Sequence, residues 1–321
     1  MRAVQVLQPT GPADVVVRDV PEPEPGPGQV LVEVHSVGVS FPDLLLSKGQ
    51  YQLRPEPPFT LGVDFAGVVV SGPDGFEPGQ RVAGVASHGN AAELVASPAD
   101  TTFVLPDALS FDEGAALPMN YLTAQFALAD RAGLQAGETV LVHGAAGGVG
   151  TASIQVAKGY GARTIAVVST EEKAAVAKQA GADEVVLVDG FKDATMALTD
   201  GRGVDVIVDV VGGDVFTDSL RALAPQGRLL VVGFAAGQGI PEVRVNRLLL
   251  NNIDVRGVGW GGYAMTRPGF MQQQWAELLP MMESGVVKPP VGTTYPMEEF
   301  GQALLDLDAR KALGKSVVRL R

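Results

Sequence analysis

The sequence of 321 residues predicts an α/β fold, in which a β-rich region is combined with a doubly wound parallel sheet. Three observations predict this fold. Short runs of β-forming residues, separated by Pro and Gly, fill residues 1 to 115. Residues 139–158, TVLVHGAAGGVGTASIQVAK, join an apolar run to a helical pattern through a cluster of small residues. From Val140 onward, strand and helix patterns alternate, which is typical of a doubly wound sheet.

The strands expected in the first region are Val4–Leu7, Val30–Val34, Gly67–Val70, Arg81–Val85 and Ala92–Val95. The segment Pro21–Gly28, PEPEPGPG, is too short and too closely flanked to be a disordered linker. It is expected to form a rigid connection into the Val30 strand.

The second region begins with helical spacing over Glu113–Ala129. Strands are then expected at Val140–Val142, Thr164–Val168, Glu184–Val188, Asp205–Asp209, Leu229–Val232 and Asp254–Val258. Helices are expected at Glu171–Ala180, Val215–Leu223, Gly269–Glu283 and Gln302–Leu307, and a final strand at Ser316–Leu320. This order is compatible with a β-rich domain that is interrupted by an inserted α/β domain and completed by the C-terminal segment.

The turn after the Val140 strand has the composition of a dinucleotide-binding motif. Ala145, Gly147 and Gly150 occupy the G/A-x-G-x-x-G positions. The first two let the backbone turn sharply and approach a pyrophosphate, and Gly150 lets the new helix pack closely on the strand. The N–H groups at the helix start, including those of Gly148 and Val149, would face the phosphates. An ordinary Gly-rich turn is the alternative, but the flanking strand and helix favour a cofactor site.

The end of the next strand favours NADPH over NADH as that cofactor. An acidic residue usually stands there in NAD-selective sites, whereas this chain has Ser169 and Thr170, with Lys173 one turn later. Two hydroxyls and a cation suit a 2′-phosphate, which a carboxylate would repel. Ser169 is also a candidate helix N-cap, paired with Glu172 in a capping box, and the two roles can coexist. The neighbouring Glu171 and Glu172 argue against a phosphate.

Composition excludes several classes of function. The net charge of −12 argues against non-specific binding to nucleic acid or to an anionic membrane. The absence of Cys excludes disulfides, Cys-ligated zinc, iron–sulfur clusters and thiol catalysis. No signal peptide is evident at the start, and no apolar run is long enough to span a bilayer. A soluble, cytoplasmic protein is therefore expected.

Several longer segments closely resemble the zinc-independent quinone oxidoreductases of the medium-chain dehydrogenase/reductase superfamily. They include GVSFPDLLLSKGQYQ (Gly38–Gln52), PFTLGVDFAGVV (Pro58–Val69), ALPMNYLTAQFAL (Ala116–Leu128), GRGVDVIVDVVGGDVF (Gly201–Phe216) and GRLLVVGFAAG (Gly227–Gly237). The resemblance implies a GroES-like catalytic domain, residues 1–115 plus 261–321, around a Rossmann domain of residues 116–260. It also implies a homodimer formed through the nucleotide domains.

The chain departs from the zinc alcohol dehydrogenases of this superfamily at each catalytic zinc position. Ser40 stands in place of the first ligand, Val63 in place of the second, and Met119 and Asn120 in the region of the third. These side chains do not form a zinc site. None of the three histidines has a second potential metal ligand at metal-binding spacing; they are His35, His88 and His143. They are expected to be structural, and no metal is expected.

A site without metal, Cys or an evident His base suits hydride transfer from NADPH to an electrophilic acceptor. A quinone or an α,β-unsaturated carbonyl qualifies, because conjugation spreads the developing negative charge onto oxygen. The protein then has to position the acceptor and donate hydrogen bonds to that oxygen.

Five residues are candidates for this site. Tyr51 is a candidate donor to the acceptor oxygen, because the resemblance places the GQY tyrosine at the cleft, although a packing role is the alternative. Ser40, where relatives commonly carry Asn, is a candidate contact to the nicotinamide ribose or substrate. The resemblance implies that Asn120 and Thr123 line the nicotinamide side. Phe234 is expected to cover the nicotinamide–ribose end.

Two other interpretations stay open. One is an enoyl-thioester reductase, for which a cationic patch would bind the phosphates of coenzyme A. The candidate arginines are Arg54, Arg244, Arg247 and Arg267. The other is an NADPH-binding sensor without turnover. Asp43 and Asp64 lie in the matched motifs, and buried ion-pairing or turn roles are expected for them rather than catalysis.

Overall fold

The computed structural model describes residues 1–321 and divides them into two compact units. The first unit comprises residues 1–119, 268–275 and 291–321, and the second comprises residues 120–267 and 276–290. The first unit thus contains the C-terminal segment of the chain. Residues 261–267 and 276–290 group with the second unit, whereas the predicted first domain contained all of 261–321. The predicted domain boundaries stay a prediction.

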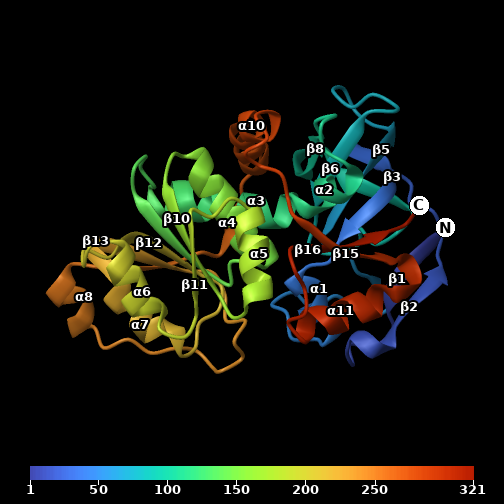
Figure 1. The fold of residues 1–321 in the computed structure, drawn as a ribbon. Coiled ribbons are helices and arrows are strands. Elements are labelled where there is room, and N and C mark those ends of the chain that lie inside the picture. Colours follow the sequence, from blue (N-terminus) through green and yellow to red (C-terminus); the bar gives the residue numbers. More distant parts are fainter. The chain divides into compact units, whose positions relative to one another are not determined.

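The first unit is built on β-sheets (Figure 1). One sheet has the order β15-β16-β3-β5-β6-β8, with β7 also pairing with β3, and a smaller one has the order β2-β1-β4. The strands are β1 (Arg2–Val6), β2 (Val15–Asp19), β3 (Gln29–Gly38), β4 (Phe59–Thr60), β5 (Asp64–Ser71), β6 (Arg81–Val85), β7 (Leu94–Pro98), β8 (Thr102–Val104), β15 (Val291–Pro296) and β16 (Lys315–Arg319). The helices are η1 (Pro12–Asp14), α1 (Phe41–Ser47), η2 (Ala99–Thr101), α2 (Phe111–Ala116), η4 (Met297–Glu299) and α11 (Phe300–Asp308).

Alternating burial along the strands forms the core of this unit. In β3, Val30, Val32 and Val34 are buried, and the intervening residues are partly exposed. Their side chains pack in one cluster with residues of β1, β5 and α11. Because β16 pairs with β3, a strand from the end of the chain completes the sheet that begins near its start.

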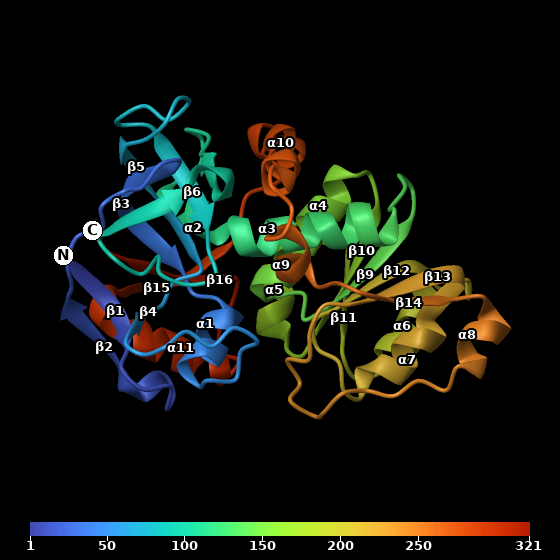
Figure 2. The same cartoon turned by 180° about the vertical axis from the view of Figure 1, so that it is seen from behind.

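The second unit is a parallel sheet with the order β11-β10-β9-β12-β13-β14 (Figure 2). The strands are β9 (Thr139–His143), β10 (Arg163–Val168), β11 (Glu184–Leu187), β12 (Val204–Asp209), β13 (Leu223–Val231) and β14 (Asp254–Gly257). The helices are α3 (Pro118–Gln125), η3 (Phe126–Ala132), α4 (Gly148–Gly159), α5 (Glu171–Gln179), α6 (Phe191–Leu198), α7 (Val215–Ala222), α8 (Asn246–Asn251) and α9 (Trp260–Ala264). Helix α10 (Phe270–Glu283) has residues in both units.

The central strands of this sheet are buried on both faces. All residues of β9 and β12 are buried, as expected for parallel strands that helices cover on each side. Helix α4 packs with α5 and η3, and α6 packs with α7. The strand order reverses between β9 and β12, which is the point where ligands bind in open α/β sheets.

One predicted helix is wrong in its extent. The continuous helix expected over Glu113–Ala129 is divided into α2, α3 and the π-helix η3. The division between α2 and α3 falls at Leu117, before Pro118, because proline has no backbone N–H with which to continue the hydrogen bonds of α2. Helix η3 ends at Gly133, which adopts left-handed backbone (φ 62°).

Candidate functional site

The glycine turn joins β9 to α4 at the carboxyl edge of the parallel sheet. Gly144 follows β9 with φ 62°, a left-handed conformation that glycine adopts without strain. The turn covers residues 144–146 with a bend at Gly147, so the small residues named from the sequence lie within it, and its left-handed position is Gly144. Gly147 is the N-cap of α4 with extended backbone, and no side chain caps the helix. The first N–H groups of α4 therefore have neither a carbonyl partner within the helix nor a capping side chain.

The glycines of this turn are required for different reasons. A Cβ on Gly150 would lie 2.2 Å from the Gly144 carbonyl oxygen, so its absence lets α4 pack against the turn, as predicted. A Cβ on Gly148 would lie 2.5 Å from the Asn120 side-chain nitrogen. A Cβ on Gly147 would meet only the Gly144 oxygen, at 3.4 Å. The space beside Gly147 is thus open, and the turn fits a pyrophosphate.

Asn120 and Thr123 lie one turn apart in α3, and both are buried. The contact with Gly148 brings the Asn120 amide directly against the glycine turn. No local pattern in the sequence indicates this contact, because the two residues belong to separate helices. Thr123 lies on the same helix, one turn closer to its C-terminal end.

The end of β10 presents two hydroxyls and one cation. β10 lies beside β9, so this end is at the same sheet edge as the glycine turn. The Lys173 ammonium lies 3.2 Å from the Ser169 hydroxyl. Thr170 caps α5 by accepting a hydrogen bond from the Lys173 backbone N–H, so the expectation that Ser169 caps this helix is wrong. Ser169 and Lys173 are thereby left together at the surface, where they fit a phosphate.

Two further features lie at this edge of the sheet. Phe234 follows β13, is 39% exposed, and lies close to Gly212, where a Cβ would meet its ring at 2.9 Å. Asp209 ends β12 and was not singled out from the sequence. Its Oδ1 accepts hydrogen bonds from the N–H groups of Val211 and Gly212, which shape the loop beside Phe234. Burial raises the pKa of Asp209.

Ser40 belongs to a buried polar network in the first unit. Its backbone N–H donates to Asp43, and its hydroxyl donates to Asp64 at 2.9 Å. Asp43 also accepts from the Gly62 N–H at 2.9 Å, and burial raises its pKa to about 7. Lys315, from β16, pairs with Asp64 at 2.7 Å. Asp64 thus forms a buried ion pair, one of the two roles expected for these carboxylates, whereas Asp43 caps the start of α1.

Lys315 was missed by the sequence analysis. It directly precedes the last predicted strand, Ser316–Leu320, within the sequence GKSVVRLR, and lies 275 positions after Ser40. The only signal was a lysine next to a run of apolar strand residues. Nothing local shows that its partners lie just after the end of β3 and at the start of β5.

Tyr51 follows α1 and is partly buried. Its ring packs against the core of the first unit, as the packing alternative expected. Burial, with a smaller contribution from the nearby Asp43 carboxyl, raises the pKa of its hydroxyl. The hydroxyl therefore stays protonated at neutral pH and can donate a hydrogen bond.

The residues at the zinc positions do not form a metal site. No group of three or more His, Cys, Asp or Glu side chains is arranged to hold a metal ion. The histidines pack on aromatic rings: His35 on Phe111, His88 on Phe59 and His143 on Phe191. His143 is buried, lies 2.8 Å from the Ser219 hydroxyl, and has its pKa lowered by burial to about 3.

Replacing His143 with glutamine is expected to reduce the loss of stability at acid pH. Below its ordinary pKa of 6.5 the unfolded chain binds a proton that the folded chain rejects down to about pH 3. This histidine therefore lowers the free energy of unfolding by up to about 1.4 kcal/mol for each pH unit of acidification. Urea unfolding at about pH 7 and about pH 5 measures the slope. His35→Gln is the control, because that side chain is 29% exposed and should change the slope less. Equal slopes in wild type and His143→Gln would contradict the assignment.

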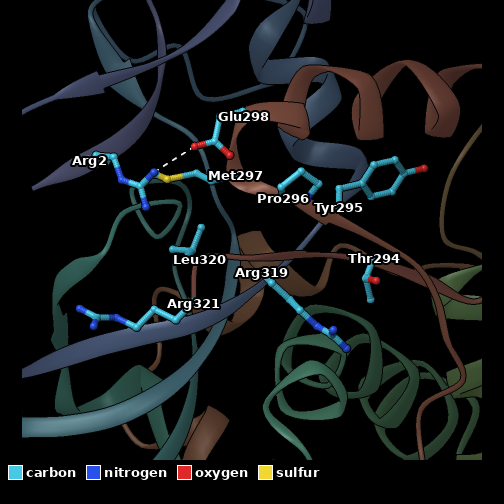
Figure 3. Close-up of a pocket in the computed structure, with 9 residues that line it drawn as sticks. All are labelled: Arg2, Thr294, Tyr295, Pro296, Met297, Glu298, Arg319, Leu320 and Arg321. Carbon is cyan, nitrogen blue, oxygen red and sulfur yellow. Dashed lines mark hydrogen bonds and ion pairs between the residues drawn. The ribbon is translucent and has the colours of Figure 1, made fainter.

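The structure also contains a surface pocket of about 410 Å³ in the first unit (Figure 3). It is lined by Arg2, Thr294, Tyr295, Pro296, Met297, Glu298, Arg319, Leu320 and Arg321. Its arginines are paired with carboxylates, namely Arg2 with Glu93 and Glu298, Arg319 with Asp112, and Arg321 with Glu33. The pocket therefore offers no unpaired cation for an anionic ligand.

No contact joins the four arginines considered for a coenzyme A site into one patch. Arg244 and Arg247 lie at the start of α8. Arg267 lies over the Tyr263 ring at 3.6 Å and donates to the Tyr263 carbonyl. Arg54 belongs to the other unit.

A glycine turn at the switch point of a parallel sheet, in a chain that also has a separate β-rich unit, is typical of NAD(P)-dependent oxidoreductases. Comparison with known families agrees. Residues 26–107 match the alcohol dehydrogenase GroES-like domain, and residues 148–284 match the zinc-binding dehydrogenase domain. No helix is both long and apolar enough to cross a membrane.

The similarity to individual proteins extends over almost the whole chain. Quinone oxidoreductase-like protein 2 of Rattus norvegicus is 40% identical over 302 residues, which cover 92% of this chain and 86% of that protein. A probable oxidoreductase from Mycobacterium abscessus is 43% identical with a TM-score of 0.90, covering 99% of this chain and 98% of that one. The quinone oxidoreductase from Thermus thermophilus, solved also in complex with NADPH, is 36% identical with a TM-score of 0.86, and each chain is covered fully (100%).

The chain belongs to the quinone oxidoreductases of the medium-chain dehydrogenase/reductase superfamily. The predicted family and the predicted combination of a GroES-like domain with a Rossmann domain are confirmed.

Proposed function

We propose that the protein is an NADPH-dependent reductase that transfers a hydride to a quinone or an α,β-unsaturated carbonyl. The observation that carries the proposal is the edge of the second unit, where an uncapped helix start and a Ser–Lys pair follow adjacent strands. The relatives named for quinone reduction support the acceptor class. The donor set at the zinc positions supports a reaction without metal.

The second unit would hold NADPH through its backbone and a small set of side chains. The N–H groups of Gly148, Val149 and Gly150 would bind the pyrophosphate, and the open space at Gly147 would admit it. Ser169 and Lys173, with Thr170 beside them, would bind the 2′-phosphate. Asn120, Thr123 and Phe234 are the candidates for the nicotinamide end. When bound, NADPH supplies the hydride.

In the first unit, Tyr51 is the proposed hydrogen-bond donor to the acceptor oxygen. Its raised pKa keeps the hydroxyl protonated while negative charge develops on that oxygen. The ring packs on the core, so its position is fixed before the acceptor binds.

Replacing Lys173 with methionine is expected to weaken NADPH binding about tenfold to a hundredfold, because a hydrogen bond between charged groups is worth about 1.5–3 kcal/mol. NADH has no 2′-phosphate, so its affinity should change by less than about twofold. Fluorescence titration with both nucleotides measures the two dissociation constants. Lys178→Met, on the exposed last turn of the same helix, is the matched control and should change neither. Equal losses for both nucleotides would refute the 2′-phosphate site.

The proposed function is tested by NADPH oxidation in the presence of EDTA, with 9,10-phenanthrenequinone and a 2-alkenal as parallel acceptors. Turnover with either one is expected, and the preferred acceptor separates quinone from enone chemistry. Tyr51→Phe should lower kcat about tenfold or more if the hydroxyl stabilises the oxyanion. NADPH binding without turnover of either acceptor would contradict a reductase of this class.

We further propose that the protein forms a homodimer through the second unit. Four apolar side chains of the segment that leads through α8 are more than 70% exposed, namely Ile240, Val245, Leu249 and Leu250. This segment precedes β14, the end strand of the sheet, whose outer edge has no partner strand within the chain. A second copy presents the same edge and the same apolar residues, so the surface can pair with itself. Light scattering should report twice the mass of one chain, and a monomer would contradict this proposal.

A further inference from the structure

The buried network around Lys315 lies where β3 ends and its two antiparallel neighbours, β5 and β16, begin. In the sheet, β16 pairs with β3 and β3 pairs with β5, which brings Lys315, the end of β3 and Asp64 together. Gly38, at the end of β3, makes this possible, because a Cβ there would lie 2.7 Å from the Lys315 Cε and 3.1 Å from the Asp64 Cβ. The backbone of β3 thus leaves room for the lysine stem.

Burial of this network is nearly complete. The side chains of Lys315 and Asp64 are 5% and 0% exposed, and Ser40 is 4% exposed. Moving two charges out of water costs about as much free energy as their attraction returns. Replacing such a pair with apolar residues of similar volume often leaves the stability of the fold unchanged or raises it. Stability therefore does not explain why the chain has a charged pair at this position.

The direction of the hydrogen bonds shows what the pair does to Ser40. The Lys315 ammonium donates to the Ser40 hydroxyl oxygen at 2.6 Å and to Asp64 Oδ2 at 2.7 Å. The Ser40 hydroxyl donates its own proton to Asp64 Oδ2 at 2.9 Å. Asp64 Oδ1 is held separately by the Met119 N–H at 2.8 Å. A cation that donates to a hydroxyl oxygen strengthens that hydroxyl as a donor.

We propose that Lys315 is a positioning residue that acts through Ser40, whose hydroxyl turns from Asp64 to the acceptor oxygen and supplies the proton that completes the reduction. This inference rests on the proposed reductase function. Lys315 returns a proton to the Ser40 oxygen and does not itself contact the acceptor. Asp64 holds the Ser40 hydroxyl when no acceptor is bound.

The step balances in atoms and charge. The acceptor receives two electrons and one hydrogen as hydride, and its oxygen becomes negatively charged. The Ser40 O–H bond breaks as a new O–H bond forms on the acceptor, and Ser40 takes a proton from Lys315. The resulting neutral amine stays beside Asp64 and regains a proton from water. Asp43, also buried here, holds the Ser40 backbone N–H throughout.

The test is a double-mutant cycle on kcat with Ser40→Ala, Lys315→Met and the double variant, at saturating NADPH and acceptor. Each single change should lower kcat about a hundredfold or more, because a general acid contributes about 10²–10⁴-fold to the rate. The double variant should lose no more than Ser40→Ala alone, because Lys315 acts only through that hydroxyl. Losses that multiply would overturn the inference. NADPH affinity should stay within about twofold in every variant.

Lys315→Met leaves Asp64 buried without its cation and is at risk of misfolding. The neutral combination Asp64→Asn with Lys315→Met removes this problem and should fold with kcat still lowered. The solvent deuterium isotope effect on kcat should be present in the wild type and reduced in this variant. If the neutral variant kept the wild-type kcat, the proposed role of Lys315 would be wrong, but the proposed reductase function would not be affected. A wild-type protein that turns over no acceptor would instead overturn the proposed function.

Discussion

Replacing Arg228 with methionine is expected to lower the free energy of unfolding by about 3–5 kcal/mol, the cost of breaking a buried ion pair from one side. The Arg228 side chain is 10% exposed and forms a two-point pair with Glu138, at 2.6 and 2.7 Å. It also donates to the Ala132 carbonyl at 2.9 Å. Without the guanidinium, the buried carbonyl and a largely buried carboxylate lose their partner at the same time.

Urea unfolding of the wild type and the variant measures this loss directly. Arg221→Met is the matched control, because Arg221 pairs with Asp218 on the surface with both side chains about half exposed (47% and 45%). Such a pair contributes about 0–1 kcal/mol. The Arg228 pair also lowers the pKa of Glu138, so its contribution should decrease as acid protonates that carboxylate. Similar losses in both variants would show that the Arg228 network does not stabilise the fold.

The second large effect is expected from alanine substitutions at two glycines of the turn between β9 and α4. One variant should lose NADPH binding and the other should lose stability. Gly147→Ala should unfold within about 1 kcal/mol of the wild type, because its backbone is extended and its Cβ meets only one atom, at 3.4 Å. Its methyl group would occupy the space proposed for the pyrophosphate. NADPH binding should therefore weaken about tenfold to a hundredfold or more, as hydrogen bonds to the phosphates are lost.

Gly150→Ala should instead destabilise the fold. Its Cβ would lie 2.2 Å from the Gly144 oxygen and 2.8 Å from the Ala145 Cα, so backbone has to move. Overpacking of this kind costs about 1–3 kcal/mol or more. Thermal unfolding and NADPH titration of both variants separate the two effects. If Gly147→Ala binds NADPH normally, the pyrophosphate is not held at this turn.

The sequence predicted the parallel sheet well because its signals are local. The strands β9, β10 and β12 were each placed within a residue or two, since an apolar run between turn residues is visible in a short window. The pairing of Ser169 with Lys173 was also predictable, because a spacing of four residues at one helix start brings the two side chains together. The cap of that helix was wrong by one residue, since Ser and Thr are both good caps and sequence does not choose between neighbours.

What the sequence alone determined about this protein is its family, its two kinds of fold and the glycine turn between β9 and α4, because each depends on residues that are neighbours along the chain. Only the tertiary structure decided what surrounds them. Asn120 meets Gly148 because α3 packs beside the start of α4, and Lys315 meets Ser40 because β16 pairs with β3. Such contacts depend on the order of strands in a sheet and on the packing of helices, which no pattern within one segment contains.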